Sequence, residues 1–140
     1  MQKVAIIGTG FIGRAWAICF ARAGYECRMW DAVPQAVDTA IGYIAPILDD
    51  LAASDLLGGH TQDDVLARLV PCRTLDDALQ GVGYVQESTF ERLEDKIAVF
   101  EALTARTPAE TIVASSTSAI LPSAFTATCT HRERAIVVHP

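Results

Sequence analysis

Residues 3–13 read KVAIIGTGFIG, an apolar run that enters a G-x-G-x-x-G turn, and Asp31 follows after a stretch with helical character. An apolar strand, a glycine turn of this spacing and a carboxylate about 20 residues further on form the fingerprint of a dinucleotide-binding βαβ unit. Gly8 lets the chain turn tightly off the strand. Gly10 lets the backbone approach a pyrophosphate, and Gly13 lets the first helix pack closely.

The residues around the glycine turn agree with this pattern. The sequence predicts a buried strand over Val4–Ile7, a helix over Phe11–Ala23 and a second strand over Glu26–Trp30. The backbone amides of Phe11 and Ile12 would then lie at a helix N-terminus, where unpaired N–H groups and the helix dipole favour a phosphate.

The type of dinucleotide follows from the end of the second predicted strand. A carboxylate at that position, here Asp31, accepts hydrogen bonds from the adenosine ribose and repels a 2′-phosphate. The next residues are Ala32 and Val33, so no arginine follows to receive such a phosphate. We therefore expect NAD rather than NADP.

Composition narrows the class of protein. The 140 residues are 51% hydrophobic and 20% charged, which fits one globular domain. The net charge of −6 argues against nucleic acid as a partner, and no apolar run is long enough for a bilayer or resembles a signal peptide. The four cysteines show neither C-x-x-C spacing nor pairing with histidine, so we expect no metal site and interpret them as small core residues of a cytoplasmic protein. They are Cys19, Cys27, Cys72 and Cys129.

The rest of the chain alternates between strand-like and helix-like segments. Further helices are predicted over Pro34–Ala53, Gln62–Arg68, Thr74–Leu79 and Glu91–Ala105, and further strands over Leu69–Arg73, Gly81–Gln86, Thr111–Ala114 and Ala135–Val138. Such alternation predicts an α/β fold, a Rossmann-type doubly wound parallel sheet in the order 3-2-1-4-5-6, formed as a single domain over residues 1–140.

In such sheets ligands bind beyond the carboxyl ends of the strands. Three polar segments follow predicted strands: residues 86–96, residues 115–118 and His139. All three should face the same crevice as the glycine turn. His60 and His131 fall in predicted surface loops instead.

Four stretches give the chain a family resemblance: GTGFIGRAW from residue 8, YVQESTFERLEDK from residue 84, ASSTSAILPS from residue 114 and the final VVHP. Together they resemble the NAD-binding N-terminal domain of the 3-hydroxyacyl-CoA dehydrogenase superfamily, most closely its branch of lambda-crystallin and L-gulonate 3-dehydrogenase. The acyl-CoA branch usually carries S-N-T-S where this chain has Ser116 in place of the asparagine, which supports that assignment.

The resemblance implies oxidation of a 3-hydroxyl group to a ketone, with hydride transferred to NAD. Glu91 and Lys96 match residues that contact the cofactor near its nicotinamide end. They also fit a solvated helix pair, because Glu91 would lie in the first turn of the predicted helix, where the dipole favours an acid. Ser118 matches the serine that binds the substrate oxygen, although such runs are also common in loops and helix caps. His139 matches the general base, a role that suits imidazole because its ordinary pKa lies near neutrality.

The resemblance also implies features beyond Pro140. These are a carboxylate that orients the histidine and a helical domain that forms the substrate pocket and a homodimer interface. We therefore expect this chain alone to bind NAD without transferring hydride. An NAD-binding module without catalysis is an alternative, as is another NAD enzyme of the same fold, such as a 6-phosphogluconate or nucleotide-sugar dehydrogenase.

The distribution of charge along the chain bears on the class of substrate. Between Arg28 and Arg68 the chain has no lysine or arginine, and six aspartates lie there after Asp31. These acids would repel the phosphates of coenzyme A if they faced the pocket, and would not matter if they faced solvent. A free 3-hydroxy acid such as gulonate or 3-hydroxybutyrate is therefore favoured over a CoA thioester.

Overall fold

The computed structural model describes residues 2–140 as a parallel sheet with helices on both faces. The elements, in chain order, are β1 Lys3–Ile7, α1 Phe11–Arg22, β2 Glu26–Trp30, α2 Ala36–Ala53, α3 Gln62–Leu66, β3 Leu69–Pro71, α4 Leu75–Leu79, β4 Tyr84–Glu87, α5 Leu93–Arg106, β5 Ile112–Ser115, α6 Pro122–Phe125, the 3₁₀ turn η1 Arg132–Arg134 and β6 Ala135–Val137. The six strands lie in the order β3-β2-β1-β4-β5-β6, which confirms the predicted Rossmann topology.

Strand register aligns the carboxyl ends of the central strands. Ile7 of β1 pairs with Trp30 of β2 and with Glu87 of β4. Glu87 in turn pairs with Ser115 of β5, which pairs with Val137 of β6. The residue after each strand end therefore lies along one edge of the sheet, at the point where a doubly wound sheet binds its ligand.

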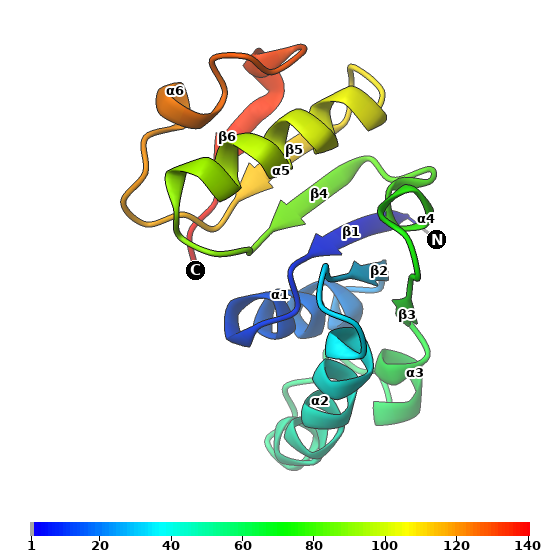
Figure 1. Ribbon diagram of the computed structural model, residues 1–140. Coiled ribbons are helices and arrows are strands. Elements are labelled where there is room, and N and C mark those ends of the chain that lie inside the picture. The colour runs from blue at the N-terminus through cyan, green and yellow to red at the C-terminus, as the bar shows by residue number, and fades with distance from the viewer. Residues whose placement is uncertain (1) are drawn as a thin grey trace.

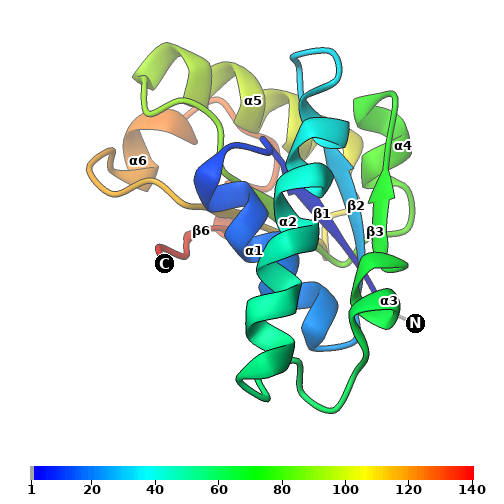
Figure 2. The same ribbon diagram turned by 90° about the horizontal axis from the view of Figure 1, so that it is seen from below.

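Two hydrophobic layers enclose the sheet. Helices α1, α2 and α3 cover one face through side chains such as Ala17, Ile44 and Val65. Helices α4, α5 and α6 cover the other face, where the rings of Phe100 and Phe125 pack with centroids 4.6 Å apart and planes tilted by 58°. Figures 1 and 2 show α1 and α2 on the side of the sheet opposite α5.

Several predicted boundaries are wrong by a few residues. The second long helix begins at Ala36 rather than Pro34, because Gln35 has a left-handed backbone with φ of 61°. The fourth strand begins only at Tyr84, since Gly81 has φ of 71° and belongs to the preceding turn. Helix α5 begins at Leu93, so Glu91 precedes it instead of lying in its first turn. The short α6 and η1 were not predicted.

Candidate functional site

The glycine turn between β1 and α1 depends on close backbone contacts. Gly8 has φ of +87°, and a Cβ there would lie 2.7 Å from the carbonyl oxygen of Ser88. A Cβ on Gly13 would lie 1.9 Å from the carbonyl oxygen of Gly8. A side chain at Gly8 would therefore force the turn away from the loop after β4, and one at Gly13 would force α1 away from the turn.

Gly10 differs from these two glycines. A Cβ on it would have no neighbour within 4 Å, so the folded chain itself does not require a glycine there. Gly10 also lies immediately before α1, whose first residues are Phe11 and Ile12. The open space before a helix N-terminus is the place where a pyrophosphate can approach the backbone amides.

A cavity of about 650 Å³ opens beside this turn. Its lining includes Gly8, Gly10, Phe11 and Ile12 from the turn, together with Asp31 and residues 88–90 after β4. Five of the residues predicted to bind the cofactor thus border one cavity. The remaining predicted site residues are not part of its lining: Gly13, Glu91, Lys96, Ser118 and His139.

Asp31 lies at the end of β2 and contacts the glycine turn. Its Oδ2 accepts hydrogen bonds from the Thr9 backbone N–H at 2.7 Å and from the Thr9 hydroxyl at 3.0 Å. Its Oδ1 accepts one from the Val33 backbone N–H at 2.9 Å. A carboxylate offers about four acceptor positions, so one remains for a ribose hydroxyl even with all three contacts intact.

A buried ion pair lies beneath the loop that follows β4. Glu87 is 0% exposed and Lys96 only 1% exposed, and Lys96 Nζ donates to Glu87 Oε1 at 2.7 Å. The carboxylate of Glu87 also accepts from the backbone N–H and hydroxyl of Thr89 and from the Ser115 hydroxyl, each at 2.6 Å. Because every oxygen is bonded, the pair can remain charged inside the protein.

This burial settles one alternative from the sequence. Lys96 is not half of a solvated surface pair, because its side chain is enclosed and also donates to the Thr89 carbonyl at 3.2 Å. Its Nζ lies 3.8 Å from Glu91 Oε2. Lys96 therefore joins α5 to the loop after β4, and its contact with the cofactor stays a prediction.

Glu91 organises the loop after β5. Its Oε1 accepts hydrogen bonds from the Thr117 hydroxyl at 2.6 Å and from the backbone amides of Ser118 at 2.9 Å and Ala119 at 3.1 Å. Partial burial raises the pKa of the Glu91 carboxyl, but these hydrogen bonds outweigh it and hold the pKa below its ordinary value of 4.5. Glu91 thus stays ionised and fixes the backbone that carries the predicted substrate serine.

Ser118 and His139 are both exposed near the carboxyl edge of the sheet. The structure joins Ser118 to Glu91 through its backbone amide. His139 follows β6, where the Val138 backbone N–H donates to the Ser115 carbonyl at 2.9 Å. Their catalytic roles stay predictions.

Gln86 and Glu87 of β4 belong to the predicted polar segment 86–96, but their burial was not predicted. Both are 0% exposed, and Gln86 Nε2 donates to the Ser116 hydroxyl at 2.8 Å and to the Val138 carbonyl at 3.3 Å. The signal that could have identified their burial is a pair of consecutive polar side chains directly at the end of an apolar strand, since buried polar groups need partners.

The cysteines fit the sequence interpretation only in part. Cys27 is buried, and its burial raises the pKa of its thiol to about 12. Cys72 and Cys129 are half-buried, whereas Cys19 is exposed, so the interpretation of Cys19 as a core residue is wrong. Cys19 occupies an outward-facing position of α1, which the apolar appearance of that helix concealed.

The two remaining histidines differ in exposure. His131 is exposed, as predicted, whereas His60 is half-buried and its Nδ1 lies 3.2 Å from the Arg68 guanidinium. Within residues 2–140 no group of three His, Cys, Asp or Glu side chains is placed to hold a metal ion. No helix of the described chain combines the length and apolar character needed to cross a bilayer.

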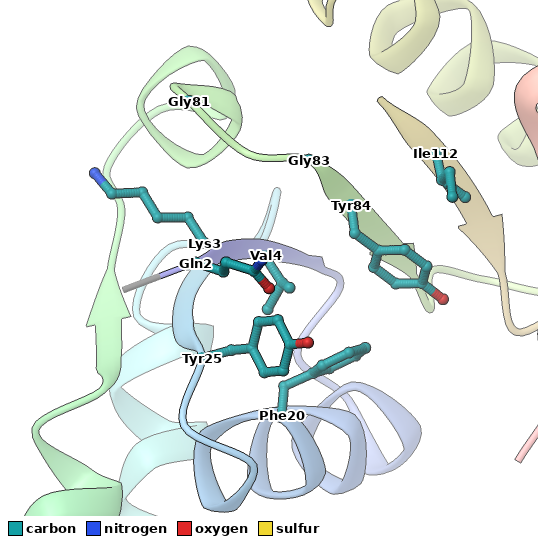
Figure 3. Close-up of a pocket in the computed structure, with 9 residues that line it drawn as sticks. All are labelled: Gln2, Lys3, Val4, Phe20, Tyr25, Gly81, Gly83, Tyr84 and Ile112. Carbon is teal, nitrogen blue, oxygen red and sulfur yellow. The ribbon is translucent and has the colours of Figure 1, made fainter. Parts of the chain in front are cut away.

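A second hollow of about 520 Å³ lies at the opposite edge of the sheet. It is bordered by the first residues of β1, β4 and β5, and the rings of Phe20, Tyr25 and Tyr84 project around it (Figure 3). Ligands of open α/β sheets bind at the carboxyl ends of the strands. The cavity beside the glycine turn is therefore the candidate cofactor site.

The strand order, the glycine turn and the carboxylate at the end of β2 together define a dinucleotide-binding Rossmann domain. The chain belongs to the family described as 3-hydroxyacyl-CoA dehydrogenase, NAD binding domain, whose model matches residues 3–140. The family resemblance predicted from the sequence is confirmed, and NAD is the cofactor of this domain.

The individual relatives include a crystallin and two dehydrogenases. The chain is 31% identical over 138 residues to lambda-crystallin of Oryctolagus cuniculus, covering 98% of this chain and 43% of that protein. It is 36% identical over 140 residues to L-carnitine dehydrogenase of Streptomyces griseus, covering 100% of this chain and 41% of that protein. The structure of 3-hydroxybutyryl-CoA dehydrogenase from Escherichia coli superposes with a TM-score of 0.90 at 30% identity, covering 99% of this chain and 29% of that one. The chain thus spans less than half of each relative.

Proposed function

We propose that this domain supplies the cofactor half of an NAD-dependent dehydrogenase that oxidises the 3-hydroxyl of a 3-hydroxy acid to a ketone. The observation that carries the proposal is the Glu91 carboxylate, which binds the loop of Ser118 at the sheet edge that also carries the glycine turn. Substrate-positioning and cofactor-binding groups thus share one edge.

The residues present fit NAD. Gly10 leaves open space before α1, Asp31 retains an acceptor position for the ribose, and the cavity between them is large enough for a ligand. When bound, NAD supplies a nicotinamide ring that accepts hydride from the carbon bearing the hydroxyl.

The protein residues handle the proton and the oxygen. His139 would accept the hydroxyl proton as the carbon–oxygen double bond forms, and the Ser118 hydroxyl would donate a hydrogen bond to that oxygen. Ser118 is prepared for this because its backbone is already held by the ionised Glu91. Proximity of such groups contributes to rate only when their geometry is held.

A free hydroxy acid is the favoured substrate. The six aspartates between Arg28 and Arg68 after Asp31 are exposed and lie outside the cofactor cavity, so they face solvent and their charge does not distinguish the two substrate classes. The support from the chain itself is Ser116, which stands where the acyl-CoA branch usually carries an asparagine. One relative is named for L-carnitine, which is itself a free 3-hydroxy acid.

Two alternatives have specific support. A CoA thioester substrate is favoured by the structural similarity to 3-hydroxybutyryl-CoA dehydrogenase. A non-catalytic NAD-binding role is compatible with the similarity to lambda-crystallin. We further propose that the whole protein is a cytoplasmic homodimer whose helical domain completes the substrate pocket.

The test uses both this chain and the whole protein that contains it. NAD should bind the chain in a calorimetric titration, and the whole protein should reduce NAD with free 3-hydroxy acids at a higher kcat/KM than with their CoA thioesters. Ser118→Ala and His139→Gln should lower kcat while leaving NAD affinity within about twofold. NAD binding without turnover on either substrate class selects the non-catalytic role, and a higher kcat/KM for the thioesters selects that class.

A further inference from the structure

A second polar cluster lies on the α1 face of the sheet, opposite the Glu87–Lys96 pair. Its centre is the Ser116 hydroxyl, which contacts three groups. Trp16 Nε1 lies 3.1 Å away, Gln86 Nε2 lies 2.8 Å away and the Ser88 hydroxyl lies 2.9 Å away. The three partners come from α1, from β4 and from the loop after β4, so the cluster joins distant parts of the chain.

The orientation of the Gln86 amide is set by its other neighbours. One neighbour is the Val138 carbonyl, which can only accept a hydrogen bond, so the Gln86 nitrogen faces it at 3.3 Å. The Gln86 oxygen then accepts from the Tyr84 hydroxyl at 2.7 Å. Both N–H groups of Gln86 are therefore donated, one to Val138 and one to Ser116.

The donor and acceptor positions of the Ser116 hydroxyl determine the direction of the remaining hydrogen bonds. An indole N–H only donates, so the Ser116 oxygen accepts one hydrogen from Trp16 and one from Gln86. A hydroxyl has two acceptor positions and one proton, so the proton of Ser116 must be donated to Ser88. The Ser88 oxygen thus accepts, and its own proton has no protein partner within residues 2–140.

That unused proton lies at the cofactor cavity. Ser88 is part of the cavity lining together with Gly8 and Asp31, and its backbone N–H donates to the Ile7 carbonyl at 2.8 Å, directly before the glycine turn. A hydroxyl that already accepts from the protein has its proton left for a ligand.

We propose that Ser88 donates a hydrogen bond to a ribose or phosphate oxygen of the bound nucleotide, and that Ser116 and Gln86 are positioning residues that impose this donor role. The inference rests on the cofactor site described above. It adds a polar contact from the loop after β4 to those of the glycine turn and Asp31.

The direct test compares nucleotide affinity by calorimetry in the wild-type chain and Ser88→Ala, with Ser123→Ala on α6 as a matched control for loss of an exposed hydroxyl. We expect Ser88→Ala to weaken NAD binding by about 3- to 10-fold, the range of one neutral hydrogen bond, and Ser123→Ala to change it less than twofold. ADP-ribose and AMP distinguish the acceptors, since a loss for ADP-ribose without a loss for AMP assigns the pyrophosphate or the distal ribose.

The positioning role needs a measurement that does not depend on the nucleotide. In the ligand-free chain, Ser116→Ala should speed hydrogen exchange of the Trp16 indole N–H in NMR spectra, with the Trp30 indole as internal reference. Ser116→Thr, which retains a hydroxyl, should restore slow exchange and NAD affinity. Ser116→Ala alone should weaken NAD binding, but when it is combined with Ser88→Ala it should weaken binding by less than a further twofold.

The outcomes separate the two proposals. Wild-type NAD affinity in Ser88→Ala would overturn the inference while leaving the cofactor site intact. Unchanged Trp16 exchange in Ser116→Ala would overturn the hydrogen-bond network. Failure of the wild-type chain to bind NAD would overturn the proposed function and this inference with it.

Discussion

Replacing Asp31 by asparagine tests how the protein distinguishes NAD from NADP. The Asp31 carboxylate stands at the end of β2 and is held by Thr9 and Val33. In that position it would meet the group on the 2′ oxygen of the adenosine ribose. Asp31→Asn keeps the size of the side chain and one acceptor oxygen but removes the charge.

The magnitude follows from charge and exposure. Two unit charges about 4 Å apart repel by about 4 kcal/mol at an effective permittivity of about 20. Water and salt at this partly exposed site reduce the repulsion to roughly 2–3 kcal/mol. Since about 1.4 kcal/mol is tenfold in Kd, the wild type should prefer NAD by about 30- to 140-fold.

The variant should lose most of this preference. NADP should bind Asp31→Asn more tightly, while NAD should bind about fivefold more weakly because a charge-assisted hydrogen bond becomes a neutral one. Asp50→Asn on α2 is the matched control, since it removes the same charge from an exposed side chain outside the cavity. Calorimetric titration of both nucleotides into all three proteins measures the effect. Equal wild-type affinities for the two nucleotides, or an equal change in Asp50→Asn, would refute the reasoning.

Three further predictions concern the site. Gly10→Ala should leave the melting temperature unchanged but weaken NAD binding. Gly13→Ala should lower stability by more than about 2 kcal/mol, because its Cβ would lie 1.9 Å from a carbonyl oxygen. Equal melting temperatures of the two variants would contradict this prediction. Lys96→Met should cost about 3–5 kcal/mol in urea denaturation because it leaves the buried Glu87 carboxylate without its cation, and a loss below about 1 kcal/mol would show that the carboxylate finds other compensation. Because the pKa of Glu91 is lowered in the folded chain, the contribution of this carboxylate to stability is complete above the ordinary pKa of 4.5 and is lost as the pH falls through the lower folded pKa. Thermal melts of Glu91→Gln at several pH values should therefore lack this part of the acid destabilisation. Identical pH profiles of the variant and the wild type would contradict the assignment.

The arrangement of the glycine turn and Asp31 at one cavity could be predicted from the sequence because it depends on local chain geometry. Gly8 and Gly13 act within a turn of six residues, and Asp31 lies at the end of the next strand. Short apolar runs identified all six strands, whereas exact boundaries depended on backbone conformations such as that of Gln35. The four-residue helix α6 is too short to show helical periodicity and was missed.

The rest of the site could not be predicted because its contacts join residues far apart in the chain. Trp16 and Ser116 are 100 residues apart, and nothing local in either segment identifies the other as its partner. Lys96 resembled a surface helix residue until the burial of Glu87 beneath it was known. A polar residue within an apolar strand predicts only that some partner exists.

One strand connects these two polar clusters. Successive side chains of β4 point to opposite faces of the sheet, so Gln86 contacts the α1 side through Ser116 while Glu87 contacts the α5 side through Lys96. Pairing of Glu87 with Ser115 places both clusters at the level of the glycine turn. A shift of one residue in this register would exchange the faces and place each polar group against apolar neighbours. The buried polar residues of β4 therefore favour a single register, and that register sets the edge at which the cofactor and the predicted catalytic residues meet.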